Sequence, residues 1–223
     1  MTDAGATGRA TLASRGDARA DCEEDPCMAL MILRSDNYRR MRWKNGLGET
    51  AEVAIAPHDA ALDAFDWRIS MARVESDGPF SPFAGIDRTL SILQGEGLCL
   101  VAAGGEAVTL SSTSAPYSFR GDVACDATLA GGPVTDLNVM TRRDRCWHRV
   151  RRVVAAQYDA APGLAEAFLV ASSGVAVMVS IDGAEIALSA FDSVRLGPGP
   201  WTVQVPEVGP DALLLVEIGA LAG

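Results

Sequence analysis

From Met31 onward, the sequence consists of short apolar runs that Gly, Pro, Asp and Ser interrupt every few residues. Few windows are long enough for an amphipathic helix, and several runs alternate apolar and polar residues, as strands with one buried face do. The pattern predicts an all-β protein, built as a sandwich, jelly roll or barrel. Strands are expected at 51–57, 66–74, 98–102, 108–110, 134–141, 151–158, 168–172, 175–181, 184–188, 193–196, 201–205 and 213–218.

The chain divides into three segments by composition. Residues 1–29 are rich in Ala, Gly, Asp and Arg and have almost no bulky apolar residues, which predicts a disordered N-terminal extension. An alternative is that the natural protein starts at Met28 or Met31. An apolar strand that leads into a polar turn occurs near 110–122 and again near 186–196, a weak sign of duplication. We therefore expect two β domains, 30–145 and 146–223.

The charge of the chain limits its partners. A net charge of −10 and a pI near 4.6 argue against non-specific nucleic-acid binding, which requires a basic surface. Such a protein also repels a small anion unless positive groups are concentrated at one place. Of the 19 basic residues, 18 are Arg and only Lys44 is Lys, so the positions of these residues are informative.

Nothing in the sequence suggests a membrane or an oxidising compartment. No stretch approaches the roughly 20 apolar residues of a membrane span, and the N-terminus has no secretion signal. The cysteines are odd in number and scattered, as reduced thiols inside a cell are. We expect a cytoplasmic protein without a membrane partner. The cysteines, to which we assign no chemistry, are Cys22, Cys27, Cys99, Cys125 and Cys146.

The two histidines, His58 and His148, lie far apart in the chain and form no His-x-His pair. A catalytic metal site in a β-barrel needs several histidines and a carboxylate that converge on one point. We therefore expect no metal and no cofactor. A Ser-His-Asp triad is also disfavoured, because no nucleophile-elbow motif is present.

The segment 42–50 is the most unusual in composition, because it places the only lysine beside Trp43, Asn45 and two glycines. Glycines let a backbone approach a ligand closely, and the compact charge of Lys44 suits a carboxylate. The segment matches neither a phosphate-binding loop nor a dinucleotide fingerprint. The alternative is a glycine-rich turn with an exposed lysine.

The segment 66–72 alternates, so that Arg68 and Ser70 share one face of a strand, opposite three apolar residues. If that face lines a barrel interior, the Arg68 guanidinium needs a carboxylate partner. The carboxylate can come from a ligand, or from a protein side chain such as Asp87 or Asp136.

Alternation in 136–141 places Asp136, Asn138 and Met140 together, as in a pocket of mixed polarity or on a solvent-facing edge strand. The loop 77–88 is rich in turn formers, and its Phe80 and Phe83 are expected to plug the core.

Six arginines lie between 142 and 152, with Trp147 among them. Such a run is typical of a nucleic-acid patch or of a docking site for an acidic partner. The overall negative charge favours a solvated junction between two barrels, where these arginines pair with acidic groups.

Seven blocks of the sequence, in the same order, resemble the HutD/Ves family. The resemblance covers residues 31–145 well and the rest by general pattern, and Leu47 departs from it because the family usually has a third glycine there. The blocks are Trp43-Lys44-Asn45-Gly46 with Gly48 and Thr50, Phe65-Asp66-Trp67-Arg68-Ile69-Ser70, Asp77-Gly78-Pro79-Phe80-Ser81, Gly85-Ile86-Asp87-Arg88, Gly95-Glu96-Gly97, Phe119-Arg120-Gly121-Asp122 and Asp136-Leu137-Asn138-Val139-Met140.

The resemblance implies a bicupin fold, with two small β-barrels in one chain, and an association with histidine degradation. The family is thought to bind an intermediate such as urocanate or formiminoglutamate, with no settled enzymatic activity. Its Ves branch is linked to cold and stress responses. A homodimer is expected only by analogy with other cupins.

Together, these observations predict metal-independent binding of a small anionic metabolite. The alternatives are a metal-independent enzyme, with Lys44 as acid or base and Asp87 or Glu52 as its partner, and a stress-related interaction module. Lys44 and Arg68 are expected to hold the carboxylate, Asn45, Ser70 and Asn138 to orient it, and Trp43, Phe83 and Met140 to supply apolar walls, with Arg88 added by the resemblance.

Overall fold

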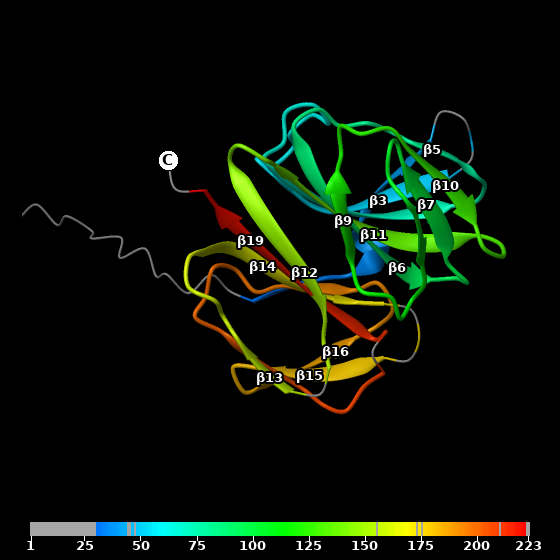
Figure 1. Ribbon diagram of the computed structural model, residues 1–223. Helices are drawn as coiled ribbons and strands as arrows, with labels where there is room; N and C mark the ends of the chain where they lie inside the picture. The colour runs from blue at the N-terminus through cyan, green and yellow to red at the C-terminus, as the bar shows by residue number, and fades with distance from the viewer. Residues whose placement is uncertain are drawn as a thin grey trace, which may run out of the picture.

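The computed structural model describes residues 30–43, 46, 48–154, 156–172, 174, 176–209 and 211–221. The described chain is all β, apart from one short 3-10 turn, η1 (Ser35–Asn37), as the sequence predicted. The strands form four sheets, stacked as four layers in two halves (Figure 1). The predicted N-terminal extension, residues 1–29, lies outside the described residues.

The N-terminal half consists of a six-stranded sheet and a four-stranded sheet that faces it. The larger sheet has the order β2-β3-β4-β11-β6-β9 and the smaller one β5-β10-β7-β8. The strands of the larger sheet are β2 (Arg39–Arg42), β3 (Gly48–Ala56), β4 (Trp67–Val74), β11 (Val134–Arg142), β6 (Ile86–Gln94) and β9 (Tyr117–Arg120). Those of the smaller sheet are β5 (Gly78–Phe80), β10 (Cys125–Leu129), β7 (Leu98–Ala102) and β8 (Ala107–Leu110).

The C-terminal half repeats this plan with a five-stranded and a four-stranded sheet, ordered β1-β17-β14-β19-β12 and β13-β18-β15-β16. The five strands are β1 (Met31–Leu33), β17 (Ser193–Arg195), β14 (Leu164–Ala171), β19 (Leu213–Ala220) and β12 (Cys146–Arg152). The four are β13 (Ala156–Asp159), β18 (Thr202–Val205), β15 (Val177–Ile181) and β16 (Ala184–Leu188).

The first strand, β1, belongs to the sheet of the other half. Its residues lie within the range predicted for the first domain, yet β1 pairs antiparallel with β17. The crossing is fixed by Arg34, which forms an ion pair of 2.7 Å with Asp192, and by Tyr38, whose hydroxyl lies 3.0 Å from the hydroxyl of Ser193. The N-terminal residues therefore join the two halves.

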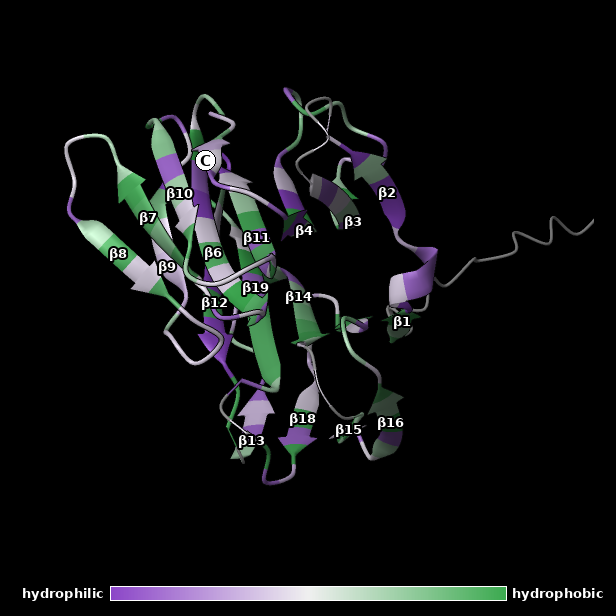
Figure 2. Ribbon diagram, turned by 90° about the vertical axis from the view of Figure 1, so that its right-hand side faces the viewer, coloured by the Kyte–Doolittle hydropathy of each residue, from purple (hydrophilic) through white to green (hydrophobic). Residues whose placement is uncertain are grey.

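The two large sheets pack back to back through a central apolar core. Trp67, Ile69 and Leu137 on one sheet contact Phe168 and Val216 on the other, and all five are buried. The rings of Trp67 and Phe168 meet edge to face, with centroids 5.7 Å apart. Figure 2 shows β19 as largely hydrophobic, whereas the edge strand β2 is hydrophilic. Because this core lies on one face of each sheet, the opposite face of each is directed into its own half.

Gly48, at the start of β3, is held in a close approach between strands. A Cβ atom there would overlap the carbonyl oxygen of Arg73 and lie 3.0 Å from the ring of Trp43. We expect Gly48→Ala to lower the free energy of unfolding by about 1–3 kcal/mol, as overpacking does. Urea denaturation followed by circular dichroism measures the loss. Gly78→Ala, with no atom within 4 Å of its added Cβ, is the matched control, and an equal loss in both variants would contradict this account.

Candidate functional site

The inner face of the six-stranded sheet carries a row of three residues that we call the arginine row: Arg68, Met140 and Arg88. In the strand register, Met140 lies opposite Arg68 on one side and opposite Arg88 on the other. In the neighbouring row, Ser70 lies opposite Asn138. Alternation turns all five side chains away from the central core, and all five are buried. Five of the predicted ligand-binding residues therefore lie side by side.

Arg68 forms an ion pair with Glu52 on β3. Its Nε donates to Glu52 Oε2 at 2.8 Å, and its Nη1 donates to the hydroxyl of Ser70 at 3.2 Å. The protein partners considered from the sequence, Asp87 and Asp136, were wrong, since Glu52 occupies this position. The reason is the register of β3 and β4, which places Glu52 opposite Ser70 just before a β-bulge.

Arg88 is held between two aromatic rings. Its guanidinium carbon lies 4.6 Å from the ring centroid of Phe80 and 5.5 Å from that of Phe119, a cation–π arrangement. Its Nε donates to Asn138 Oδ1 at 2.7 Å. Burial lowers the pKa of Arg88 to about 10, so the guanidinium stays charged at neutral pH.

Asp136 continues this polar chain, because the side-chain amide of Asn138 donates to Asp136 Oδ1. Its other oxygen, Oδ2, is buried and has no hydrogen-bond partner among the described residues. Burial raises the pKa of Asp136 to about 7, although the charge of Arg88 and a hydrogen bond from the Ala72 backbone favour the ionised form. At neutral pH this face therefore carries two cations, one carboxylate and one acid that is only partly ionised.

A hollow of about 310 Å³ opens at one end of this half. Phe83 and Ile86, which line it, pack in a small apolar cluster with Met140, the middle residue of the arginine row. Arg142 donates to two backbone carbonyls there, at 3.0 and 3.1 Å, so its charge faces no carboxylate in direct contact. The hollow is lined by Leu62, Asp63, Pro82, Phe83, Ala84, Ile86 and Arg142.

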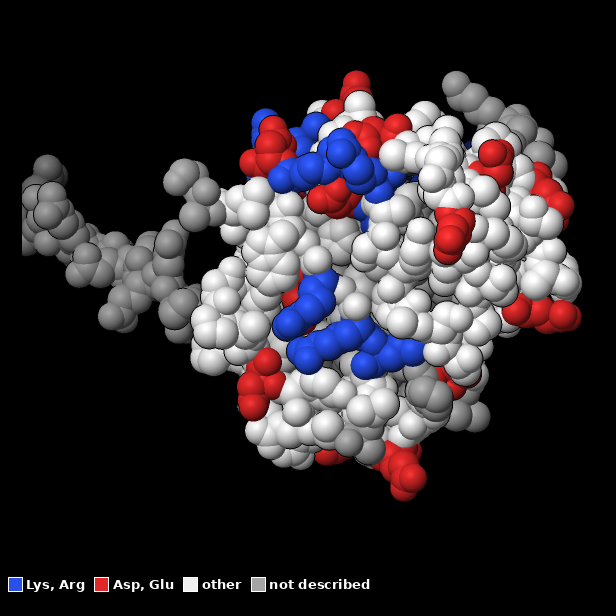
Figure 3. All heavy atoms as spheres, in the orientation of Figure 1, with Lys and Arg blue, Asp and Glu red and all other residues white. Residues whose placement is uncertain are grey.

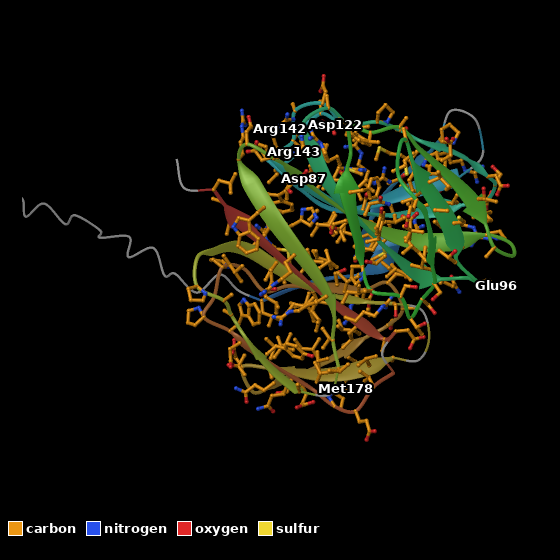
Figure 4. The ribbon with its side chains drawn as sticks, viewed as in Figure 1. Asp87, Glu96, Asp122, Arg142, Arg143 and Met178 are labelled. Carbon is orange, nitrogen blue, oxygen red and sulfur yellow. The ribbon has the colours of Figure 1, made fainter. Side chains whose placement is uncertain are left out.

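Ion pairs fix the rim beside this hollow. Arg143 contacts Asp87 at 2.7 Å and Asp122 at 3.2 Å, and thereby joins the start of β6 to the turn after β9. Figure 4 shows Asp87, Asp122, Arg142 and Arg143 together at this end of the N-terminal half. Asp87, which the sequence left open as a catalytic partner, is thus one partner of Arg143.

The remaining predicted residues do not join the arginine row. Phe83 lies at one end of the face. At the opposite end, the indole nitrogen of Trp43 donates to the hydroxyl of Thr50 at 2.8 Å. Thr50 lies two rows of inward-facing residues away from Arg68. Two rows correspond to roughly 13 Å along a strand. The other two predicted residues, Lys44 and Asn45, lie outside the described residues.

His148 lies between the halves, where both ring nitrogens contact hydroxyls of the six-stranded sheet. Nε2 is 2.7 Å from Thr89 Oγ1, and Nδ1 is 2.7 Å from Thr141 Oγ1. Burial lowers the pKa of His148 to about 4. In the described part of the chain, no cluster of three or more His, Cys, Asp or Glu residues is arranged to hold a metal ion. That part also contains no helix long and apolar enough to span a membrane.

The lowered pKa of His148 makes its contribution to stability dependent on pH. The unfolded chain binds a proton near pH 6.5 and the folded protein only near pH 4, so stability is lost as the pH falls through this window. The loss is about 2 kcal/mol between pH 7 and pH 5. Asp136 acts in the opposite direction, because its raised pKa favours the folded state in acid.

The contribution of His148 is isolated as the difference in unfolding free energy between the wild type and His148→Gln, measured by urea denaturation at each pH. We expect this difference to change by about 2 kcal/mol between pH 7 and pH 5. His58→Gln, at an exposed histidine, is the control for loss of an imidazole and is measured at the same pH values. A constant difference for His148→Gln would contradict the assignment.

The family follows from comparison with known proteins. The model of the HutD family matches residues 35–212. The chain belongs to the HutD family. This result confirms the resemblance found in the sequence, and the match spans both halves of the fold.

The chain is similar in sequence to two curated proteins, one from Pseudomonas putida and one from Citrobacter koseri. It is 34% identical over 171 residues to the "Uncharacterized 21.2 kDa protein in hutC 3'region" of Pseudomonas putida, covering 75% of this chain and 86% of that protein. It is 41% identical over 110 residues to protein Ves of Citrobacter koseri, covering 49% of this chain and 56% of that protein. The chain therefore matches only about half the length of Ves.

Solved structures agree with the fold. HutD from Pseudomonas fluorescens SBW25, described in a formate condition, superposes with a TM-score of 0.73 at 28% identity, over 87% of this chain and all of that one. At 10% identity, Ylba from E. coli gives a TM-score of 0.60 over 86% of this chain and 90% of its own, which supports a cupin-like all-β fold alone.

Proposed function

We propose that this HutD protein binds a small carboxylate metabolite of the urocanate or formiminoglutamate class and thereby moderates histidine degradation, without a metal ion. The observation that carries the proposal is the arginine row. Two guanidinium groups, Arg68 and Arg88, are buried on one face of a protein with a net charge of −10. A buried cation needs an anion near it; Glu52 pairs with Arg68, whereas Arg88 contacts no carboxylate directly among the described residues.

The ligand is expected to lie with its carboxylate toward the arginine row and its body in the hollow beside Phe83. The hollow of about 310 Å³ has the volume of roughly ten water molecules, which suits a small carboxylate metabolite. Met140, the middle residue of the row, packs with Phe83 and Ile86 of the hollow, and its flexible thioether side chain can shift to admit a ligand. Ser70 and Asn138 would orient the carboxylate, and Arg142 would bind a second polar group at the rim.

The proposal retains three finer expectations from the sequence. Each two-sheet half is taken as one cupin barrel, so that the whole is a bicupin, and the protein is placed in the cytoplasm as a possible homodimer. Histidine utilisation is supported by the position of the P. putida relative, which is named for the hutC 3' region. Three of the predicted residues are not used in the proposed site: Lys44, Asn45 and Trp43.

The direct test is calorimetric titration of the purified, metal-stripped protein with urocanate, formiminoglutamate, histidine and glutamate. Saturable binding of one of the first two is expected, with at least a tenfold loss in Arg68→Ala. Arg73→Ala, at an exposed arginine paired with Glu75 just beyond the end of β4, is the matched control and should bind as the wild type does. Absence of binding to all four by folded protein would sink the proposal, and turnover would replace it with an enzyme.

Binding is expected to weaken as the pH rises, because of Asp136. Below its pKa of about 7 the acid is neutral, and above it the carboxylate competes with the ligand for Arg88. The dissociation constant should therefore rise about tenfold from pH 6 to pH 8. Calorimetry at both pH values, with Asp136→Asn as the variant that should lose the dependence, measures this effect. Equal affinity of the wild type at pH 6 and pH 8 would contradict it.

A further inference from the structure

Three arginines of β12 lie at the junction of the two halves, apart from the proposed carboxylate site: Arg149 and Arg151 share one face of the strand, and Arg152 contacts the N-terminal half from the other face. We call Arg149, Arg151 and Arg152 the waist arginines. Figure 3 shows a stripe of basic side chains at the waist of the molecule, between the upper and lower halves. The side chains of Arg149 and Arg151 are 54% and 37% exposed.

The waist arginines carry more positive charge than their protein partners neutralise. Arg149 Nε lies 2.8 Å from Glu217 Oε2, and Arg151 Nη2 lies 3.4 Å from the other oxygen of the same carboxylate. Arg152 donates to two neutral backbone acceptors, Ser114 O at 2.7 Å and Ile92 O at 3.2 Å. Arg149 and Arg151 therefore share one carboxylate, and Arg152 contacts none directly among the described residues.

Several donors of these guanidinium groups are unused. Arg151 Nε and Arg152 Nη1 are buried and have no hydrogen-bond partner, and the terminal nitrogens of Arg149 have none among the described residues. Buried donors are normally satisfied by protein, water or a ligand. The terminal nitrogens of Arg149, whose side chain is 54% exposed, are therefore open to an anion, and Arg151 and Arg152 each keep one buried donor without a partner.

The same guanidinium groups are held in place before any ligand arrives. The Glu217 side chain is completely buried and lies directly opposite Arg149 in the strand register. Arg151 packs its guanidinium over the ring of Tyr158, 5.2 Å from the centroid. The two carbonyls from the N-terminal half fix Arg152. Such preorganisation reduces the entropy lost when an anion binds.

We infer that the waist arginines form a binding site for a small dianion, a phosphate group or a dicarboxylate. The guanidinium fork matches the oxygens of both groups. The site is too short for an acidic peptide, because Arg149 to Arg152 spans only roughly 10 Å of one strand. The rest of the protein carries a net negative charge, so an extended acidic chain would be repelled beyond this stripe.

Titration calorimetry at constant ionic strength tests the site, with inorganic phosphate in one arm and glutarate in the other. The wild type is expected to bind at least one of them saturably, and Arg149→Gln to weaken that binding at least tenfold. Arg73→Gln is the matched control, because its side chain is 54% exposed, as that of Arg149 is, and is also paired with a glutamate. Which arm binds more tightly distinguishes a phosphate from a dicarboxylate.

Glu217→Gln tests the site in the opposite direction. Gln keeps the shape of the side chain but removes the carboxylate that competes with the ligand for Arg149 and Arg151. Dianion binding is therefore expected to tighten several-fold, whereas a purely structural arginine cluster would show no such gain. Circular dichroism confirms that each variant is folded, so that this second variant remains informative if Arg149→Gln unfolds.

The two sites are separated by Arg68→Ala, which should leave dianion binding at the waist unchanged even if it abolishes binding of the metabolite. The inference is overturned if neither phosphate nor glutarate binds saturably at constant ionic strength. It is also overturned if Arg73→Gln weakens binding as much as Arg149→Gln, or if Glu217→Gln leaves binding unchanged. Binding of polyglutamate in place of both small anions would make the waist a peptide surface.

Discussion

Arg88→Met is expected to weaken carboxylate binding at least a hundredfold. Arg88 is buried, and its guanidinium lies within cation–π distance of the rings of Phe80 and Phe119. Loss of one partner of a buried charge pair typically costs about 2–5 kcal/mol of binding. Calorimetric titration with the carboxylate that binds the wild type measures the loss.

The same variant reports on folding. Without Arg88, the Asn138 carbonyl loses its donor, and we expect a loss of about 1–3 kcal/mol in the free energy of unfolding. Arg120→Met, at an exposed arginine of the adjacent strand β9, is the control for both measurements. Undiminished affinity in folded Arg88→Met would remove Arg88 from the site, even if Arg68 proved essential.

Phe168→Ala is expected to destabilise the whole protein by about 3–5 kcal/mol. Phe168 is completely buried and packs against Trp67 of the other half, so its removal opens a cavity between the two large sheets. Because this core joins the halves, the loss should appear as one shifted transition. Urea unfolding followed by both circular dichroism and tryptophan fluorescence measures it.

Val101→Ala, at an exposed position of β7, is the matched control for this cavity and should change stability by less than about 0.5 kcal/mol. Two separate transitions in Phe168→Ala, with only one of them shifted, would show that the halves unfold independently. That outcome would contradict the role assigned to the central core.

The composition of the inner face could be predicted from the sequence. Period-2 alternation alone placed Arg68 with Ser70, and Asn138 with Met140, and these pairs share one buried face of the six-stranded sheet. That the two segments are neighbours was not evident from their separation in the chain, because antiparallel pairing of β4 with β11 depends on the global topology.

Other features depend on register and on contacts distant in sequence. The β-bulge in β3 decides that Glu52, rather than Asp87, meets Arg68. Phe119 has no sequence signal that connects it with Arg88, and the segment 31–33 gave no indication that it would pair with β17. Arg142 belongs to the arginine run recognised in the sequence, but its contacts with backbone carbonyls could not be predicted.

The crystal structure of this protein with bound urocanate would test the central claim most directly. We expect a carboxylate oxygen within hydrogen-bond distance of Arg68 or Arg88, with the Met140 side chain displaced and the body of the ligand toward the hollow beside Phe83. A ligand bound elsewhere, with Glu52, Met140 and the arginine row unchanged, would contradict the account.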